Sequence, residues 1–304
     1  MFVKKLSSIR KKKWENFYRG NRIDMAEKFS IGIAIDPGLK RRAQPNQDSI
    51  GTSYIEPDIK HRQLLVLSDG MGGYGGGELA SKITVSTLIK TYAEANNEKE
   101  TPLETLRKGI NNSIAGIIEK SFEDSAISEM GCTVVAAILT ENNVYLANVG
   151  DSRAYLITDS DFKQISYDHS LVAELVRCGR ITLAEADKHP RRNVLTMALS
   201  PQIKDIKPYT NTVRWNYGDR LLLCSDGLWG PVSEPLIETT TRSLEPQAAA
   251  NELIRLANLN HGPDNISVII ARNGGPVRQS AEKAENENKI KRPVFLNKFI
   301  KLYK

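Results

Sequence analysis

Six short apolar segments, rich in β-branched residues or leucine, constrain the fold of this chain more than any other feature. They are FSIGIAIDPG, QLLVLSDG, CTVVAAIL, NVYLANVG, DRLLLCSDG and NISVIIAR, and this pattern predicts strands. Apolar residues at helical spacing predict helices over 78–95, 102–122, 170–178 and 246–259. The strands come in runs separated by a helical pair, not in strict alternation with helices. The sequence therefore favours an α+β fold with packed sheets over a doubly wound parallel sheet.

Charge is distributed unevenly along the 304 residues, whose net charge is +6. Residues 1–22 carry a net charge of +7 and residues 276–304 carry +5, so the segment between them carries −6. An acidic middle suits a cation-binding site better than a nucleic-acid groove. The basic ends could contact an anionic membrane, RNA or an acidic partner, although a solvated terminus is the more frequent outcome for such charge runs.

Composition along the chain predicts three regions: a basic N-terminal extension (1–29), one domain (30–273), and a polar linker with a basic amphipathic tail (274–304). In the tail, Phe295, Phe299 and Leu302 fall at helical spacing, with lysines between them. The longest apolar runs fall short of the roughly 18 residues that span a bilayer, and the basic start lacks the apolar stretch of a secretory signal.

Three cysteines, Cys132, Cys178 and Cys224, lie far apart in the sequence. Their odd number and spacing argue against a disulfide framework and against a zinc ribbon, so we expect a reducing, cytoplasmic compartment.

Four aspartates at the ends of apolar strands are the candidate chemical groups. Asp69 ends LLVLSDG, Asp151 follows NVYLANVG, Asp226 ends RLLLCSDG and Asp264 precedes NISVIIAR. Taken singly, each is typical of a turn, because Asp-Gly is a common turn signal. If the strand ends converge, however, the carboxylates repel one another unless a divalent cation neutralises them. Oxygen ligands of this kind select Mg²⁺ or Mn²⁺ over zinc.

A glycine-rich loop follows the first of these aspartates, in SDGMGGYGGGELAS. Glycine lets the backbone approach a ligand closely and adopt positive φ. The loop has no Gly-Lys-Ser/Thr ending and no Gly-x-Gly-x-x-Gly spacing, so neither a P-loop nor a dinucleotide fold is indicated, and no nucleotide cofactor is expected.

Seven segments occur in one order: RRAQPNQDS, SDGMGGYGGGELAS, GCTVVAAIL, ANVGDSRAYLI, YDHSLV, CSDGLWGPVS and GPDNISVII. Together they resemble the ordered motifs of the bacterial metal-dependent protein phosphatases of the PP2C (PPM) family, over roughly residues 30–272. The resemblance implies an α-β-β-α sandwich, in which two antiparallel sheets pack face to face and helices flank them. It also implies a site for two or three Mn²⁺ or Mg²⁺ ions at one edge.

The resemblance assigns the two core ions to five residues. Asp69 resembles the carboxylate that bridges both ions, and Gly70 the residue whose carbonyl binds one of them. Asp226 and Asp264 are similar to the remaining ligands of the first ion. Asp48 resembles the acidic residue that holds the second ion and its water shell.

Further positions follow from the same resemblance. Asp151 is similar to the residue that shares a weaker third ion with Asp226, and Asn265 and Ser152 resemble neighbours of the ligands. The segment 168–200 is similar to a flap that shapes substrate access and begins with Asp168, His169 and Ser170. His169 itself is more typical of a structural hydrogen-bonding residue than of a ligand.

The implied activity is hydrolysis of phosphoserine and phosphothreonine in proteins that a serine/threonine kinase has phosphorylated. Two divalent ions can neutralise the phosphate dianion and lower the pKa of a bridging water. The resulting hydroxide then attacks phosphorus in line, opposite the leaving oxygen. The expected catalytic residues are Asp48, Asp69 and Arg42, and Arg42 is expected to bind the phosphate. We also expect the protein to be a monomer.

Two departures from the family pattern leave other readings open. Arg42 lies six residues before Asp48, one more than the family spacing for the phosphate-binding arginine. A one-residue bulge at Pro45 could turn Arg42 back toward the phosphate, or Arg41 and Arg42 could simply be charged surface residues. Tyr74 stands where relatives have histidine, and its ordinary pKa near 10 makes it a poorer general acid, a role that metal-bound water could take. A catalytically weak scaffold that binds a phosphoprotein is the alternative reading, and an enzyme acting on nucleic acid is a weaker third.

Overall fold

The computed structural model describes residues 29–55, 62–73, 75–95, 99–203 and 205–274. The proposed N-terminal extension and amphipathic tail therefore lie outside the described residues, apart from residues 29 and 274, and so does Tyr74. In the described part, no helix is both long and apolar enough to cross a membrane.

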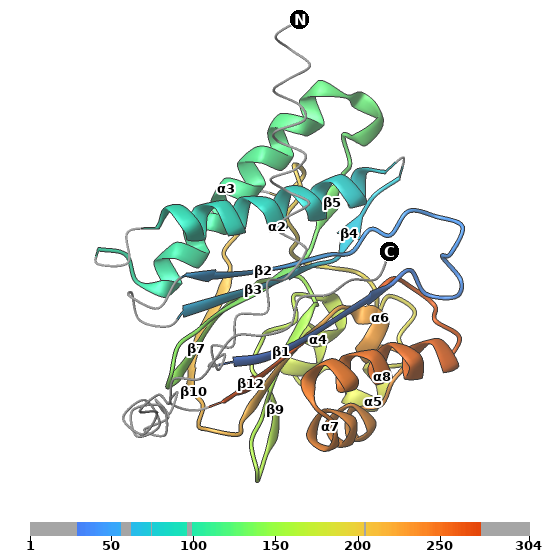
Figure 1. The fold of residues 1–304 in the computed structure, drawn as a ribbon. Coiled ribbons are helices and arrows are strands. Elements are labelled where there is room, and N and C mark those ends of the chain that lie inside the picture. The colour runs from blue at the N-terminus through green and yellow to red at the C-terminus, as the bar shows by residue number, and fades with distance from the viewer. Residues whose placement is uncertain (1–28, 56–61, 74, 96–98, 204, 275–304) are drawn as a thin grey trace, which may run out of the picture.

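Two five-stranded antiparallel sheets form the centre of the molecule (Figure 1). The first has the order β1 (Phe29–Asp36), β12 (Ile266–Asn273), β11 (Arg220–Cys224), β8 (Arg153–Ile157) and β9 (Phe162–Gln164). The second has the order β10 (Tyr209–Arg214), β7 (Asn143–Val149), β6 (Val134–Leu139), β3 (Arg62–Ser68) and β2 (Ser49–Ile55). A short ladder joins β4 (Gly70–Met71) to β5 (Gly131–Cys132).

Helices cover the outer faces of both sheets, as Figure 1 shows. The second sheet carries α2 (Gly76–Glu94) and α3 (Pro102–Glu123), and a 3-10 turn (Ser125–Ile127) follows them. The first sheet carries α7 (Glu234–Ser243) and α8 (Pro246–Leu259). The short helices α4 (Leu171–Arg177) and α5 (Leu183–Ala186) follow β9, and α6 (Asp226–Trp229) begins directly after β11. The α-β-β-α sandwich expected from the sequence is thereby confirmed.

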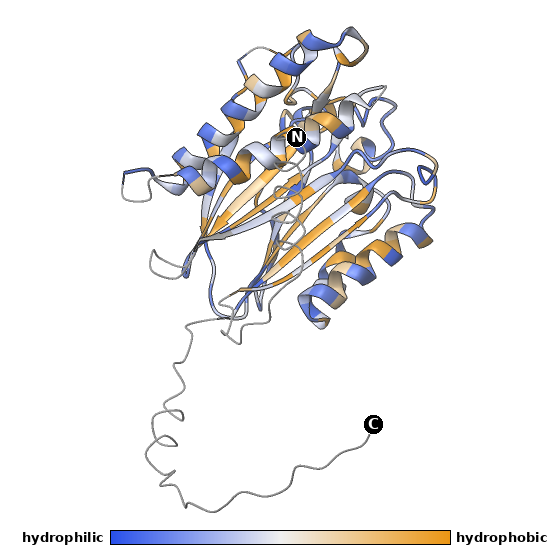
Figure 2. Ribbon diagram, turned by 45° about the horizontal axis from the view of Figure 1, so that its top comes forward, coloured by the Kyte–Doolittle hydropathy of each residue, from blue (hydrophilic) through white to orange (hydrophobic). Residues whose placement is uncertain are grey.

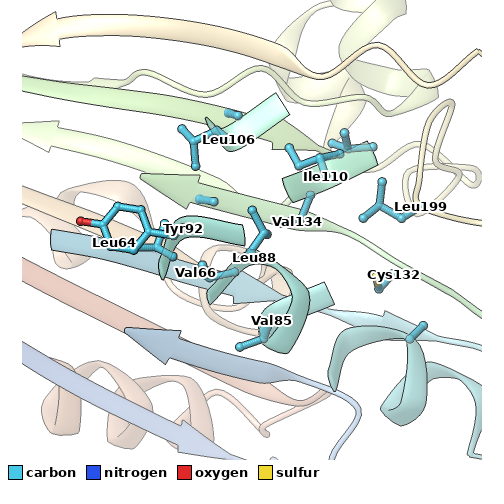
Figure 3. Close-up of a cluster of buried hydrophobic side chains, with 14 of the residues drawn as sticks. Leu64, Val66, Val85, Leu88, Tyr92, Leu106, Ile110, Cys132, Val134 and Leu199 are labelled. Carbon is cyan, nitrogen blue, oxygen red and sulfur yellow. The ribbon is translucent and has the colours of Figure 1, made fainter. Parts of the chain in front are cut away.

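Successive residues of the central strands face different layers. In β3, Leu64 and Val66 pack in the cluster under α2 and α3, which Figure 3 shows. Leu65 and Leu67 lie instead in the cluster between the two sheets. Both faces of such a strand are buried, which is why it reads as a continuous apolar run and not as an alternating one. Figure 2 shows the resulting apolar stripes along the strands and on the inner sides of the helices.

The start of α3 is defined by its own sequence. The Thr101 hydroxyl accepts a hydrogen bond from the Glu104 amide at 3.3 Å, and the Glu104 carboxylate accepts one from the Thr101 amide at 2.7 Å. Pro102 occupies the first turn, where its missing N–H is not needed. This reciprocal capping box satisfies backbone donors that the helix itself leaves open, so the helix begins where the sequence predicts.

Candidate metal centre

The antiparallel register brings the predicted aspartates together at one end of the sandwich. Ser49 of β2 pairs with Ser68 of β3, so Asp48 and Asp69 stand opposite each other at the next position of the ladder. Arg153 of β8 pairs with Cys224 of β11. Asp151 precedes β8 by two residues and Asp226 follows β11 by two, so both aspartates lie at the same end of this strand pair. The fold therefore gathers carboxylates that lie far apart in the sequence.

Close packing of the connecting loops brings the fifth aspartate to the same end. Gly38 has a φ of +73°, and a Cβ added to it would lie 2.0 Å from the Asp264 carbonyl oxygen. Gly227, directly after Asp226, packs as tightly on the Asn265 carbonyl oxygen, at 1.9 Å from an added Cβ. Side chains larger than glycine would force these segments apart.

Asp48 is buried and held by a serine relay. Its Oδ2 accepts a hydrogen bond from the Ser225 hydroxyl at 2.9 Å, and that hydroxyl accepts one from the Ser267 amide at 3.0 Å. The second oxygen of Asp48, Oδ1, is buried without a hydrogen-bond partner among the described residues, and so is Oδ1 of Asp226. Buried carboxylate oxygens without a partner are costly unless a proton or a cation neutralises them.

Burial and mutual repulsion disturb the acidity of the whole group. Burial, together with the charges of Asp226 and Asp264, raises the pKa of Asp48 to about 7. Burial and the neighbouring carboxylates also raise the pKa of Asp69 well above its usual range. The same causes raise the pKa of Asp151 to about 8 and that of Asp226 to about 6. Each raised pKa reflects the cost of burying several carboxylates near one another, a cost that a proton or a cation would relieve.

These observations fit a hard divalent cation in their donor chemistry. Several carboxylates converge, two of their buried oxygens lack partners, and oxygen-only donors are those that Mg²⁺ and Mn²⁺ prefer. The site is nevertheless not closed around an ion in this conformation. In the described ranges, no three carboxylate, imidazole or thiol groups converge closely enough to enclose one.

Asp264 is engaged by an arginine that sequence reasoning did not select. Arg41 forms a fork with it, Nε lying 2.8 Å from Oδ1 and Nη2 lying 2.9 Å from Oδ2. Arg42, the predicted phosphate-binding residue, is exposed. The structure thus places Arg41 against the cluster, while the role of Arg42 stays a prediction.

Asn265 joins the loops around the carboxylate cluster through two hydrogen bonds. Asn265 accepts a hydrogen bond from the Gln47 amide and donates one to the Pro37 carbonyl, both at 2.9 Å. The amide of Gly70 in turn donates to the Gln47 carbonyl at 3.1 Å. Asn265 therefore joins the loop before β2 to the loop before β12, with the loop after β3 linked through Gln47.

Thr133 links Asp69 to the loop that carries Asp151, a role that the sequence did not reveal. Its amide donates to the Asp69 carbonyl at 2.8 Å, and its hydroxyl accepts from the Asp69 amide at 3.1 Å. The same hydroxyl lies 2.7 Å from the Ser152 hydroxyl. The available signal was the position of Thr133 inside the segment GCTVVAAIL.

The predicted start of the flap is anchored firmly to the cluster. Asp168 is buried, and its Oδ2 lies 2.8 Å from Nη2 of Arg153. The Arg153 guanidinium stacks 3.8 Å above the ring centre of Trp229, whose indole N–H donates to the Asp151 carbonyl at 3.1 Å. A continuous chain of contacts therefore joins Asp168, where the predicted flap begins, to Asp151.

The two following flap residues have structural contacts. Burial lowers the pKa of His169, and its Nδ1 accepts a hydrogen bond from the Gly150 amide at 3.2 Å, as a neutral ring can. The hydroxyl of Ser170 accepts from the Ala173 amide at 3.3 Å and so caps the first turn of α4. These contacts agree with the structural reading of His169.

Comparison with known proteins points in one direction. The sequence profile of the family described as "Protein phosphatase 2C" matches residues 38–258. The "Serine/threonine phosphatase stp" of Listeria monocytogenes serotype 4b is 37% identical over 231 residues, which cover 74% of this chain and 89% of that protein.

Solved structures give the same result. The crystal structure of the Mycobacterium tuberculosis serine/threonine phosphatase PstP/Ppp superposes with a TM-score of 0.72 at 34% identity, covering 80% of this chain and 98% of the other. A structure of the catalytic domain of PstP in complex with two manganese ions superposes with a TM-score of 0.68 at 32% identity, covering 80% and 97%.

Proposed function

This chain belongs to the protein phosphatase 2C family and is a serine/threonine protein phosphatase, and from that premise we propose how its residues carry out the reaction. The substrate is a phosphoserine or phosphothreonine side chain of a protein. Water attacks the phosphorus in line and opposite the leaving hydroxyl oxygen, without a covalent enzyme intermediate. Region 30–273 forms the catalytic domain.

The single observation that supports this most is the group of carboxylates with raised pKa values and unpartnered oxygens. Two Mn²⁺ or Mg²⁺ ions, and a third at weaker affinity, would bind to these oxygens. The proposed ligands are Asp48, Asp69, Gly70, Asp151, Asp226 and Asp264. When bound, the ions supply the positive charge that neutralises the phosphate dianion and lowers the pKa of the attacking water.

The chain's own residues hold this arrangement in place. Ser225 orients Asp48, Thr133 orients Asp69, and Asn265 holds the three loops in register. Arg42, or Arg41 next to it, binds the phosphoryl oxygens, for which a guanidinium is well suited. The flap that begins at Asp168 shapes access for the phosphoprotein.

Several further properties remain proposals. The partners are phosphorylated proteins, no nucleotide cofactor is needed, and the protein acts as a monomer. A cytoplasmic location rests on the cysteine pattern. Cys132 and Cys224 are buried free thiols and Cys178 is an exposed one, which agrees with a reducing compartment.

The test is turnover of a phosphothreonine peptide by the full chain with Mn²⁺, with and without a chelator. We expect the chelator to abolish turnover. Asp69→Ala should lower turnover by more than about 100-fold, because losing even the outer partners of metal ligands costs roughly 10- to 100-fold. Turnover by wild-type protein that does not exceed that of Asp226→Asn would refute the proposal and favour the scaffold reading.

A further inference from the structure

The ion pair between Arg41 and Asp264 has a geometry that bears on how cations enter the site. Both oxygens of Asp264 face the guanidinium, at 2.8 Å and 2.9 Å. Such a bidentate fork is the strongest arrangement of an arginine with a carboxylate. The carboxylate assigned to the first ion is therefore occupied by a side chain of the protein itself.

We propose that Arg41 competes with the divalent cation for Asp264, so that cation binding displaces the guanidinium. The inference rests on the proposed metal dependence and adds that a side chain of the protein lowers the affinity for the cation. A divalent cation at Asp264 would place two further positive charges beside the guanidinium, and like charges at such separations repel strongly where water is partly excluded. Arg41 and the cation are therefore alternative partners of the Asp264 carboxylate.

The position of the pair permits this exchange. The side chains of Arg41 and Asp264 are 36% and 34% exposed, so the guanidinium can turn to water without disturbing the core. The charge of Arg41 also acts on Asp226, where it opposes the effect of the neighbouring carboxylates on the pKa. Arg41 thus offsets part of the negative charge that the cation would otherwise meet.

The backbone around Arg41 is fixed, so the exchange needs a side-chain movement only. The Lys40 amide donates to the Gly262 carbonyl at 3.0 Å, and the Gln44 amide donates to the Arg41 carbonyl at 2.8 Å. Asn265 holds Pro37 of the same loop. A displaced Arg41 therefore stays beside the site, ready to return when the cation leaves.

The experiment measures Mn²⁺ binding by calorimetry to chelator-stripped full-length protein, in the absence of substrate. Arg41→Gln should bind Mn²⁺ about 3- to 10-fold more tightly than wild type, the size expected for a partly exposed but bidentate charge pair. Arg41→Lys, which keeps the charge but not the fork, should fall between the two. Lys40→Gln removes the same charge from an exposed neighbour in the same loop and should stay within about twofold of wild type.

Thermal melting gives a second measurement that does not depend on activity. Arg41→Gln should melt at a lower temperature than wild type in chelator, because it lacks the ion pair, and should gain more from added Mn²⁺.

Unchanged or weaker Mn²⁺ binding by Arg41→Gln would overturn the inference, and so would equal tightening by Lys40→Gln. A wild-type protein that binds no Mn²⁺ at all would overturn the proposed metal dependence as well. The two failures are therefore distinguishable.

Discussion

In the presence of a metal chelator, Asp48 should lower the stability of the protein as pH rises. Replacing Asp48 should remove that pH dependence. The residue is 4% exposed, and the pKa of its carboxyl rises from 3.8 to about 7 in the folded chain. The folded state therefore holds a proton that the unfolded state has already released. Stability from this group is fully present below about pH 4 and is lost as pH rises to about 7.

The magnitude follows from the size of the shift. One pKa unit corresponds to about 1.4 kcal/mol, so the rise of the Asp48 pKa from 3.8 to about 7 is worth about 4 kcal/mol over the whole window. Between pH 4.5 and pH 8, about 3 kcal/mol of this is lost. For a domain of this size, that corresponds to roughly 6 to 12 °C in melting temperature.

The assay is thermal melting of Asp48→Asn and wild type in chelator at several pH values from 4.5 to 8. The stability of Asp48→Asn relative to wild type should increase with pH by about that amount, because the amide carries no charge. Asp161→Asn, on an exposed turn, is the control and should track wild type. Added Mn²⁺ should stabilise wild type more than Asp48→Asn, because wild type keeps the proposed ligand and binds the ion more tightly. A difference that stays constant or shrinks as pH rises would refute the reasoning.

Two further predictions concern the surroundings of the site. Trp229→Phe keeps a ring under Arg153 but loses the hydrogen bond to the Asp151 carbonyl. It should lose about 1 kcal/mol of stability and raise the Mn²⁺ concentration for half-maximal turnover by up to about 10-fold. Wild-type values in both melting and Mn²⁺ titration would contradict the role of this contact. Deletion of residues 276–304 should leave turnover of p-nitrophenyl phosphate intact, because the proposed catalytic domain ends before them, and a large drop would show that the tail supports catalysis.

Strands that form long apolar runs could be predicted from the sequence, including the edge strand β1, and several other strands could not. All six apolar segments contain strands of the two sheets, from β1 to β12. The segments Ser49–Ile55 and Tyr209–Arg214 were not predicted, because each is an edge strand with several polar residues. Their hydrogen bonds to a neighbouring strand, and not their own hydrophobicity, make them strands.

The helices show the same limit. The four predicted helices form within about two residues of the expected bounds. Helix Glu234–Ser243 was not predicted, since it contains four Thr or Ser residues and only Leu236 and Ile237 as large apolar side chains. Residues of this kind have modest helix propensity, so packing against the sheet and α8 decides the conformation.

In the site, positions could be predicted and partners could not. Aspartates that end strands are visible in the sequence, because burial of the strand and the turn that follows are local properties. The Ser225 hydrogen bond to Asp48 spans 177 residues and the Arg41 fork to Asp264 spans 223. Two adjacent arginines look alike in a sequence, and only the folded loop decides which of them reaches the carboxylate.

The sheet register and the carboxylate cluster depend on each other. The ladder that pairs Ser49 with Ser68 also sets Asp48 opposite Asp69, so the chain cannot form its second sheet without bringing these charges together. Protons can neutralise the cluster only below the raised pKa values. Arg41 contacts Asp264 directly and leaves the charges of the other aspartates of the cluster without such a partner among the described residues. Under the proposed metal dependence, a divalent cation is the partner that would satisfy the remaining oxygens at neutral pH. The fold therefore concentrates negative charge at the end of the sandwich where we propose that the phosphate dianion is bound and hydrolysed.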